Sequence, residues 1–137
     1  MEAHEIMQRR VTCLDSHSSI LDANDLMLSN SIRHIPVMER GEVVGIVSDR
    51  DVRSYLPETA LSLGESTSER RRKETTLRNV MQTQPLTIDP STELDEVIDA
   101  LLENKVGALL VVDSEGTLRG IISYEDILRW AREKLFD

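Results

Sequence analysis

The sequence predicts a mixed α+β fold (α/β-type mixed) in which one β-α-β-β-α unit occurs twice. Three observations predict it: an internal repeat within the 137 residues, pairs of apolar runs joined by short glycine-containing segments, and a helical spacing of apolar residues ahead of the second pair. Aromatic residues make up only 3 % of the chain, so aliphatic side chains and methionine must build the core.

The internal repeat is seen when the first half of the chain is shifted by 74 residues, which places Met7-Gln8 on Met81-Gln82. Glycines and polar residues are the informative matches, because their identity is harder to explain by chance than shared hydrophobicity. After one extra residue in the second hairpin the shift becomes 75, and it aligns Gly41 with Gly116, Gly45 with Gly120, Ser48 with Ser123 and Asp51 with Asp126.

Each copy is expected to begin with a short strand, at 11–14 and at 86–88, followed by a helix. The helix of the second copy has apolar residues at the spacing of one buried face: Leu94, Val97, Ile98, Leu101 and Leu102. Ser18 and Thr92 are placed to cap the two helices at their starts. Asn30 and Asn104 are placed to end them in a left-handed conformation.

A hairpin and a closing helix complete each copy. The hairpins are predicted from apolar runs at 35–38 with 43–47 and at 108–112 with 118–122, because a short polar segment with a glycine joins each pair. The closing helices are expected to begin near Asp49 and near Tyr124. In the second of them the apolar residues predicted to be buried are Ile127, Leu128, Ala131 and Leu135.

The repeat places the first unit at residues 1–56, a linker at 57–76 and the second unit at 77–137. The linker is rich in Ser, Thr, Glu and Arg, so it buries too little apolar surface to offset the entropy of ordering. Glutamates flank its basic run at 70–73, which favours a solvated charged segment over an anion site.

The composition argues against several classes of function. A net charge of −9 repels phosphate backbones and anionic lipid, so neither nucleic acid nor membrane is expected as a partner. Cys13 is the only cysteine, which excludes an intrachain disulfide and indicates a reducing compartment. No apolar run has the length of a membrane span and the first residues do not resemble a signal peptide, so we expect a cytoplasmic protein.

The most informative segments, 45–51 and 120–126, run from a strand into a helix and carry a Ser-x-x-Asp pattern. The serine and the aspartate then lie on one side of a helix start, where exposed N–H groups and the helix dipole favour anions. A carboxylate there can accept hydrogen bonds from the vicinal hydroxyls of a ribose. The same spacing approximates a capping box, in which both side chains satisfy only backbone donors. Spacing alone leaves both interpretations open.

The two copies resemble CBS domains, whose signature is an apolar strand, Gly-apolar-apolar-Ser/Thr-x-x-Asp and a closing helix. The resemblance covers nearly the whole chain outside the linker and the first residues, and it is specific because the motif occurs twice at corresponding places. The pattern is similar to small stand-alone CBS pairs and to the CBS portion of acetoin-utilisation-like proteins. It implies two repeats packed with pseudo-twofold symmetry around two clefts for adenine nucleotides or related adenosyl compounds, and a homodimer.

The resemblance also implies ligand-binding residues. The family's ribose-binding aspartate falls on Asp51 and Asp126, and its hydroxyl partner on Ser48 and Ser123. Its first-strand position, which lines the purine pocket, falls on Thr12, Cys13, Leu86 and Thr87. The segment that enters the second strand falls on Arg33, His34, Ile35 and Pro36, and on Gly107, Ala108, Leu109 and Leu110.

Charge distinguishes the two copies. The first has Arg33, His34, Arg50 and Arg53 near its motif, whereas the second has Gly107, Ala108, Tyr124 and Glu125, with Arg129 farther along. Charge complementarity therefore favours phosphates near Asp51, and a less anionic ligand or none near Asp126.

We therefore expect a regulatory module that binds an adenosine-containing ligand, such as AMP, ADP, ATP, S-adenosylmethionine or an NAD-like compound, and signals to a protein partner that the sequence does not identify. The alternative is a nucleotide-independent dimerisation or interaction scaffold with vestigial clefts. No enzyme activity and no required cofactor are expected, because no nucleophile–base pair or phosphate-cradling glycine loop is recognisable. No metal site is expected, because His4, His17 and His34 are scattered in the sequence.

Overall fold

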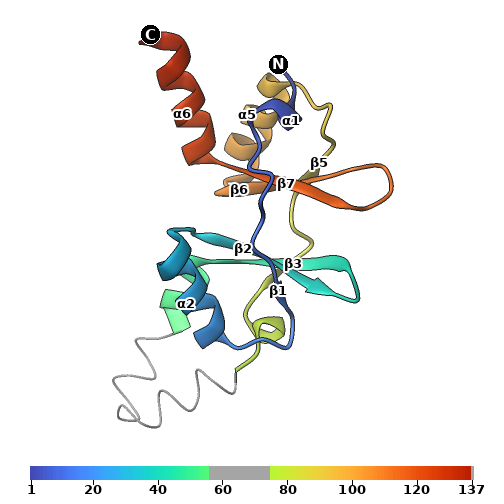
Figure 1. The fold of residues 1–137 in the computed structure, drawn as a ribbon, viewed down its shortest axis with the longest axis vertical. Helices are drawn as coiled ribbons and strands as arrows, with labels where there is room; N and C mark the ends of the chain where they lie inside the picture. The colour runs from blue at the N-terminus through green and yellow to red at the C-terminus, as the bar shows by residue number, and fades with distance from the viewer. Residues whose placement is uncertain (56–74, 137) are drawn as a thin grey trace. The chain divides into compact units, whose positions relative to one another are not determined.

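The structure, a computed structural model, describes residues 1–55 and 75–136 and is drawn in Figure 1. The chain divides into two compact units: one combines Met1–Val11 with Pro85–Asp137, and the other is Thr12–Gln84. Most of the predicted linker, with its basic run, lies outside the described residues. Within the described ranges, no helix is both long enough and apolar enough to cross a membrane.

The unit of Thr12–Gln84 contains β1 (Leu14–Asp15), α2 (Ile20–Asn30), β2 (His34–Glu39), β3 (Glu42–Ser48), the 3-10 helix η1 (Leu77–Asn79) and β4 (Gln82–Thr83). Its sheet has the order β1-β2-β3-β4. β1 is parallel to β2, and the other neighbours are antiparallel. Residues 49–55 are helical directly after β3, as predicted for the closing helix.

The other unit contains α1 (Ala3–Ile6), β5 (Thr87–Ile88), α5 (Leu94–Asn104), β6 (Ala108–Val112), β7 (Leu118–Ser123) and α6 (Tyr124–Leu135). Its sheet has the order β5-β6-β7, with β5 parallel and β7 antiparallel to β6. The predicted sequence of strand, helix, hairpin and closing helix is confirmed in both copies, and with it the mixed α+β fold.

Each unit has an aliphatic core of its own. Ile20 on α2, Val37 on β2 and Val47 on β3 are fully buried in one cluster. Val97 on α5 and Leu109 on β6 are fully buried in the other. Trp130 of α6 packs against this second cluster. Each core therefore lies between a sheet and the helix that follows its first strand, and side chains of the closing helix, such as Val52 and Trp130, also pack there.

The predicted helix caps are wrong by one residue. Ser19, not Ser18, caps α2: the backbone N–H of Asp22 donates to its Oγ at 3.1 Å. Glu93, not Thr92, precedes α5. Ser31 and Lys105 take the left-handed conformation predicted for Asn30 and Asn104. Each asparagine instead remains helical and donates its side-chain N–H to a carbonyl four residues earlier, at 3.1 and 2.9 Å.

Three leucines predicted to be buried are exposed. Leu102 on α5 is 61 % exposed, and Leu128 and Leu135 on α6 are 69 % and 73 % exposed. Ile127 and Ala131 of α6 are half-buried. Helical spacing located an apolar face correctly, but this unit alone does not cover all of that face.

An exchanged edge segment completes each sheet. Met81-Gln82, which begins the second sequence repeat, lies against β3 of the Thr12–Gln84 unit, where Gln82 pairs with Ile46. Met7-Gln8, the equivalent of this segment, lies against β7 of the other unit, where Gln8 pairs with Ile121. The sequence repeats and the compact units therefore have different bounds, because each repeat's leading segment belongs to the sheet built mainly from the other repeat.

Glycine at positions 45 and 120 permits this close approach. A Cβ atom at Gly45 would lie 2.8 Å from the carbonyl oxygen of Gln82, and a Cβ atom at Gly120 would lie 2.8 Å from the carbonyl oxygen of Gln8. The sulfur atoms of Met81 and Met7 would lie 2.6 Å from the same two positions. The glycine identity within the repeat is thus a packing requirement.

We expect Gly45→Ala and Gly120→Ala each to lower the free energy of unfolding by about 1–3 kcal/mol, because the added methyl group collides with backbone as well as with a methionine side chain. Urea denaturation followed by circular dichroism measures the change. Glu42→Ala, exposed on the same strand as Gly45, is the control and should change stability by less than about 0.5 kcal/mol. Alanine variants as stable as the parent would contradict the close approach.

Candidate functional site

The Asp51 carboxylate caps the helix that follows β3. Its Oδ2 accepts a hydrogen bond from the backbone N–H of Ser48 at 2.9 Å, and the Asp51 N–H donates to Ser48 Oγ at 3.1 Å. These are the reciprocal bonds of a capping box. Among the residues that the structure describes, Oδ1 receives only the side-chain N–H of Gln82, at 3.4 Å, the long limit for a hydrogen bond. Capping therefore uses one carboxylate oxygen, and the other is weakly held by the described residues.

The Asp126 carboxylate is held much more firmly at the start of α6. Its Oδ2 accepts from the backbone N–H of Ser123 at 2.8 Å and from Ser123 Oγ at 3.1 Å. Its Oδ1 accepts from Gln8 Nε2 at 2.8 Å and from Arg129 Nη1 at 3.4 Å. Asp126 is buried, with 7 % of its surface exposed. A carboxylate offers about four acceptor positions; three donors lie within 3.1 Å of Asp126, and the fourth, Arg129, is as distant as Gln82 is from Asp51.

The elements around Asp51 bring together several residues singled out in the first copy. His34 at the start of β2 pairs in register with Ser48 at the end of β3. The backbone N–H of Asp49 donates to the carbonyl oxygen of Arg33 at 2.8 Å, which fixes the segment before β2 beside the helix start. Arg33 and Arg50 are exposed, whereas Arg53 pairs with Asp49 at 3.3 Å. The junction thus combines one accessible carboxylate with two exposed guanidinium groups.

Burial lowers the pKa of His34; the nearby carboxylates of Asp49 and Asp51 oppose this shift and the charge of Arg33 adds to it. The imidazole is therefore neutral at neutral pH. It supplies a hydrogen-bonding group beside the Ser48 junction without adding to the positive charge that Arg33 and Arg50 already provide.

The other predicted residues of this unit differ in accessibility. Thr12 and Cys13 are half-buried in the segment just before β1. Burial raises the pKa of the Cys13 thiol, which disfavours a thiolate at neutral pH and any role as a nucleophile. Ile35 and Pro36 are buried on β2, and Ile35 belongs to the core. Ile35 has no exposed surface and is therefore a core residue in this structure.

In the other unit, residues predicted to line the second site lie along the equivalent strands. Ala108 pairs with Ser123, and Thr87 pairs with Leu110. The backbone N–H of Tyr124 donates to the Gly107 carbonyl oxygen at 3.3 Å. Leu86 is half-buried, whereas Leu109 and Leu110 are fully buried. The Tyr124 hydroxyl donates to the carbonyl oxygen of Leu101 at 3.2 Å, so this ring is fixed to α5.

Sequence reasoning missed Gln8 and Gln82 as neighbours of the two aspartates. Both amides lie on the exchanged edge segments and reach the Oδ1 atoms of Asp126 and Asp51. The Met-Gln identity within the repeat was the available signal. This identity indicated that the two Met-Gln segments are equivalent to each other. Nothing in the spacing indicated that each would pair with the strand that leads into the helix carrying Asp51 or Asp126.

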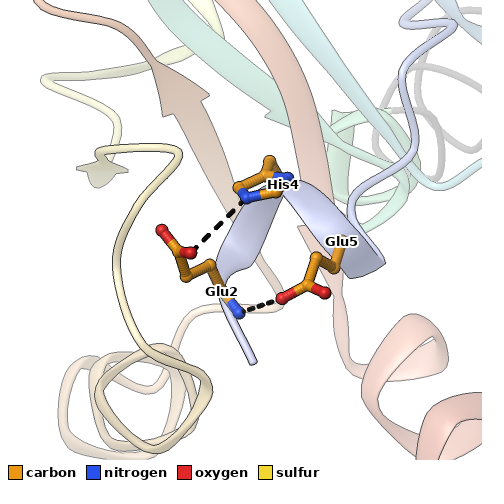
Figure 2. A group of neighbouring side chains, drawn as sticks. All are labelled: Glu2, His4 and Glu5. Atoms are coloured by element: carbon orange, nitrogen blue, oxygen red, sulfur yellow. Dashed lines mark hydrogen bonds and ion pairs between the residues drawn. The ribbon is translucent and has the colours of Figure 1, made fainter.

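Figure 2 shows Glu2, His4 and Glu5, whose potential metal-ligating atoms lie within 4.8 Å of one another. Glu5 already accepts a hydrogen bond from the backbone N–H of Glu2 at 2.7 Å, and His4 Nε2 lies 3.7 Å from a Glu2 carboxylate oxygen. The expectation of no metal site considered only histidine and cysteine spacing, so it did not consider this group. These contacts account for the cluster as local capping of α1.

A duplicated β-α-β-β-α unit, with a Ser-x-x-Asp helix start in each copy, defines a module with two equivalent candidate sites. A family model described as CBS domain matches residues 3–58 and 77–133. The chain therefore belongs to the CBS domain family and contains a tandem pair of CBS domains.

Individual relatives include enzymes that carry this module and solved structures of the module itself. An inosine-5'-monophosphate dehydrogenase of Chlorobaculum parvum is 34 % identical over 89 % of this chain, which spans only 23 % of that enzyme. The structure named as an acetoin utilization protein (AcuB) from Vibrio cholerae is 30 % identical, with a TM-score of 0.80, and 99 % of this chain matches 93 % of it. CBSX2 of Arabidopsis thaliana, solved in complex with AMP, is 24 % identical, with a TM-score of 0.78, and 97 % of each chain is covered.

The lowered pKa of His34 predicts a pH-dependent stability. Below the ordinary imidazole pKa of about 6.5, the unfolded chain binds a proton that folded His34 does not bind, so this group's contribution destabilises the fold as the pH falls. Urea unfolding at pH 7.5 and pH 5.5 should show a smaller loss for His34→Gln than for the parent. An equal loss in both proteins would contradict this assignment.

Proposed function

We propose that this chain is a regulatory module that binds an adenosine-containing ligand at the Ser48–Asp51 junction and signals its occupancy to a protein partner in the cytoplasm. It performs no reaction of its own. The observation that carries the proposal is the Asp51 carboxylate, fixed at a helix start by one oxygen while the other is held only at 3.4 Å by Gln82. A diol needs an acceptor that is oriented and still accessible.

The charges around Asp51 favour a ligand with phosphate groups. Arg33 and Arg50 are exposed, and within the described residues neither takes part in an ion pair. A guanidinium group binds phosphate oxygens with two parallel hydrogen bonds. We propose Thr12, Cys13, His34 and the backbone at Ile35 and Pro36 as the residues around the purine, and Ser48 as a further hydroxyl contact. AMP, ADP or ATP fits this arrangement better than an uncharged nucleoside does.

The site around Asp126 would take a second, less anionic ligand or none. Its cation, Arg129, already pairs with Glu125 at 3.3 Å and with Asp126 at 3.4 Å. The residues proposed there are Leu86, Thr87, Gly107, Ala108, Leu109, Leu110, Ser123 and Asp126. The relatives support ligand binding in general, since CBSX2 was solved with AMP, and the match to a dehydrogenase supports a regulatory role attached to other proteins.

Signalling to a partner requires that the ligand bind two arrangements of the module with different affinity, because only differential affinity can shift a conformational equilibrium. The direct experiment is a thermal-shift and calorimetric panel of AMP, ADP, ATP, S-adenosylmethionine and NAD. A raised melting temperature with at least one of them is expected. No binding across the whole panel would refute the proposed function.

We expect Asp51→Ala to weaken AMP binding at least tenfold, which corresponds to about 1.4 kcal/mol, whereas Asp126→Ala should change it less than threefold. The reason is that Asp51 has the accessible oxygen and the cationic surroundings. Isothermal titration calorimetry measures both affinities, and circular dichroism checks that each variant is folded. The reverse order of effects would overturn the preference for Asp51.

A second candidate function, a nucleotide-independent dimerisation scaffold, is favoured by exposed apolar side chains on α5 and on α6. The exposed apolar side chains are Leu102 on α5 and Tyr124, Leu128 and Leu135 on α6, followed by Phe136, which is 83 % exposed. α5 carries Asp95, Glu96, Asp99 and Glu103, whereas the last turns of α6 carry Arg132 and Lys134. A second copy that set its α6 against this α5 would cover the leucines and match acidic with basic side chains.

Leu128→Glu should convert the dimer to a monomer, because it places a carboxylate in the centre of the proposed interface beside apolar partners. Sedimentation velocity with and without AMP measures the species present. Leu28→Glu, which changes a leucine that is 74 % exposed on the other unit's α2, is the matched control and should leave the parent's state unchanged. A parent that sediments as a monomer in both conditions would contradict the scaffold.

A further inference from the structure

We propose that Gln8 and Gln82, the amides on the two exchanged edge segments, determine which aspartate accepts a ligand. Gln8 occupies the Asp126 carboxylate and keeps this site closed to a diol, whereas Gln82 leaves Asp51 accessible. The inference rests on the proposed function and deepens it, because it assigns the difference between the two sites to residues outside the Ser-x-x-Asp motif.

The backbones of the two glutamines are anchored in the same way. Gln8 exchanges hydrogen bonds with Ile121 on β7: its N–H donates at 2.9 Å, and its carbonyl oxygen accepts at 3.1 Å. Gln82 on β4 pairs with Ile46 on β3. The glycines that precede Ile46 and Ile121 bring each segment close to its strand. Both amides are therefore delivered to equivalent places, and only their side-chain contacts differ.

The two side-chain contacts differ in length. Gln8 Nε2 lies 2.8 Å from Asp126 Oδ1, within the normal range for a hydrogen bond, whereas Gln82 Nε2 lies 3.4 Å from Asp51 Oδ1. The Gln8 contact is part-buried and the Gln82 contact is exposed. A ribose hydroxyl that approaches Asp126 must first displace a short hydrogen bond to a charged acceptor, whereas the equivalent bond at Asp51 is longer, at 3.4 Å against 2.8 Å, and exposed.

The residue three positions after each aspartate also differs between the two sites. Arg129 on α6 adds a second donor to Asp126 Oδ1, and the residue at the equivalent place three positions after Asp51 is Ser54. The Ser54 hydroxyl donates to the backbone carbonyl oxygen of Asp51 at 3.0 Å and not to its carboxylate. Gln8 is the stronger of the two donors on Asp126 Oδ1 by distance, so its removal is the change that makes this oxygen accessible.

The test is calorimetric titration of the full chain with AMP. The parent should bind one AMP per chain, and Gln8→Ala should bind a second AMP or gain at least tenfold in affinity at the weaker site. Gln8→Met, which keeps the length of the side chain without its amide, should act in the same way and guards against a folding defect of the alanine variant. Glu42→Ala, an exposed position at the hairpin end of β3, is the control and should change AMP binding less than threefold.

A second measurement needs no ligand. If Gln8 holds the Asp126 carboxylate, Gln8→Met should lower the melting temperature of the parent and have a smaller effect in an Asp126→Asn background. Gln82→Met should show little such coupling to Asp51→Asn. Equal coupling for the two pairs would overturn the assigned difference.

The outcomes separate this inference from the function on which it rests. If the parent binds AMP through Asp51 and neither Gln8 variant gains binding, the role of Gln8 is refuted while the proposed function stands. If neither the parent nor any variant binds AMP or the other compounds of the panel, both are refuted. Gain of binding in Gln8→Ala that Asp126→Ala abolishes would support the inference.

Discussion

The close approach of a Met-Gln segment to a glycine on the neighbouring strand is the contact on which both candidate sites depend. At Gly45 and at Gly120 a backbone carbonyl oxygen of the incoming segment lies only 2.8 Å from the position that a Cβ atom would take in any other residue. This contact completes the edge of each sheet and carries a glutamine amide to the helix start beside it. The glycine of the family signature thus has a packing reason in addition to any role at a ligand.

In the Ser-x-x-Asp pattern, the aspartate side chain both caps a helix and belongs to a candidate ligand site. In both units one aspartate oxygen satisfies the backbone N–H of the serine that precedes the helix, as a capping box requires. Capping and ligand binding are therefore not exclusive for the whole residue, because one oxygen of the carboxylate caps the helix and the other is the candidate ligand contact. What differs between the units is the second oxygen, and its surroundings come from segments distant in sequence.

Much of the fold could be predicted from the sequence, because the repeat, the hairpin runs and the helical spacing are local or periodic signals. Ser18 and Ser19 are adjacent and equally able to cap, so spacing could not choose between them. Leu128 and Leu135 lie at helical spacing, but whether the chain itself covers a face depends on tertiary packing that periodicity does not contain. The same limit applies to Gln8: its bond to Asp126 joins residues 118 positions apart, and only the three-dimensional pairing of β7 reveals it.

The division of the chain also affects the order in which it can fold during synthesis. Thr12–Gln84 is continuous, so β1, β2, β3 and β4 are made before the strands of the other unit, whereas Met1–Val11 must wait for β7, which is made later in the chain. The chain between Met7-Gln8 and β7 forms a long loop when the two segments pair. The entropy lost on closing a loop grows only slowly with its length, so this long separation in sequence costs little stability. Met7-Gln8 nevertheless has no partner strand until β7 has been made, and the apolar side chain of Met7 lacks its packing against Gly120 until then.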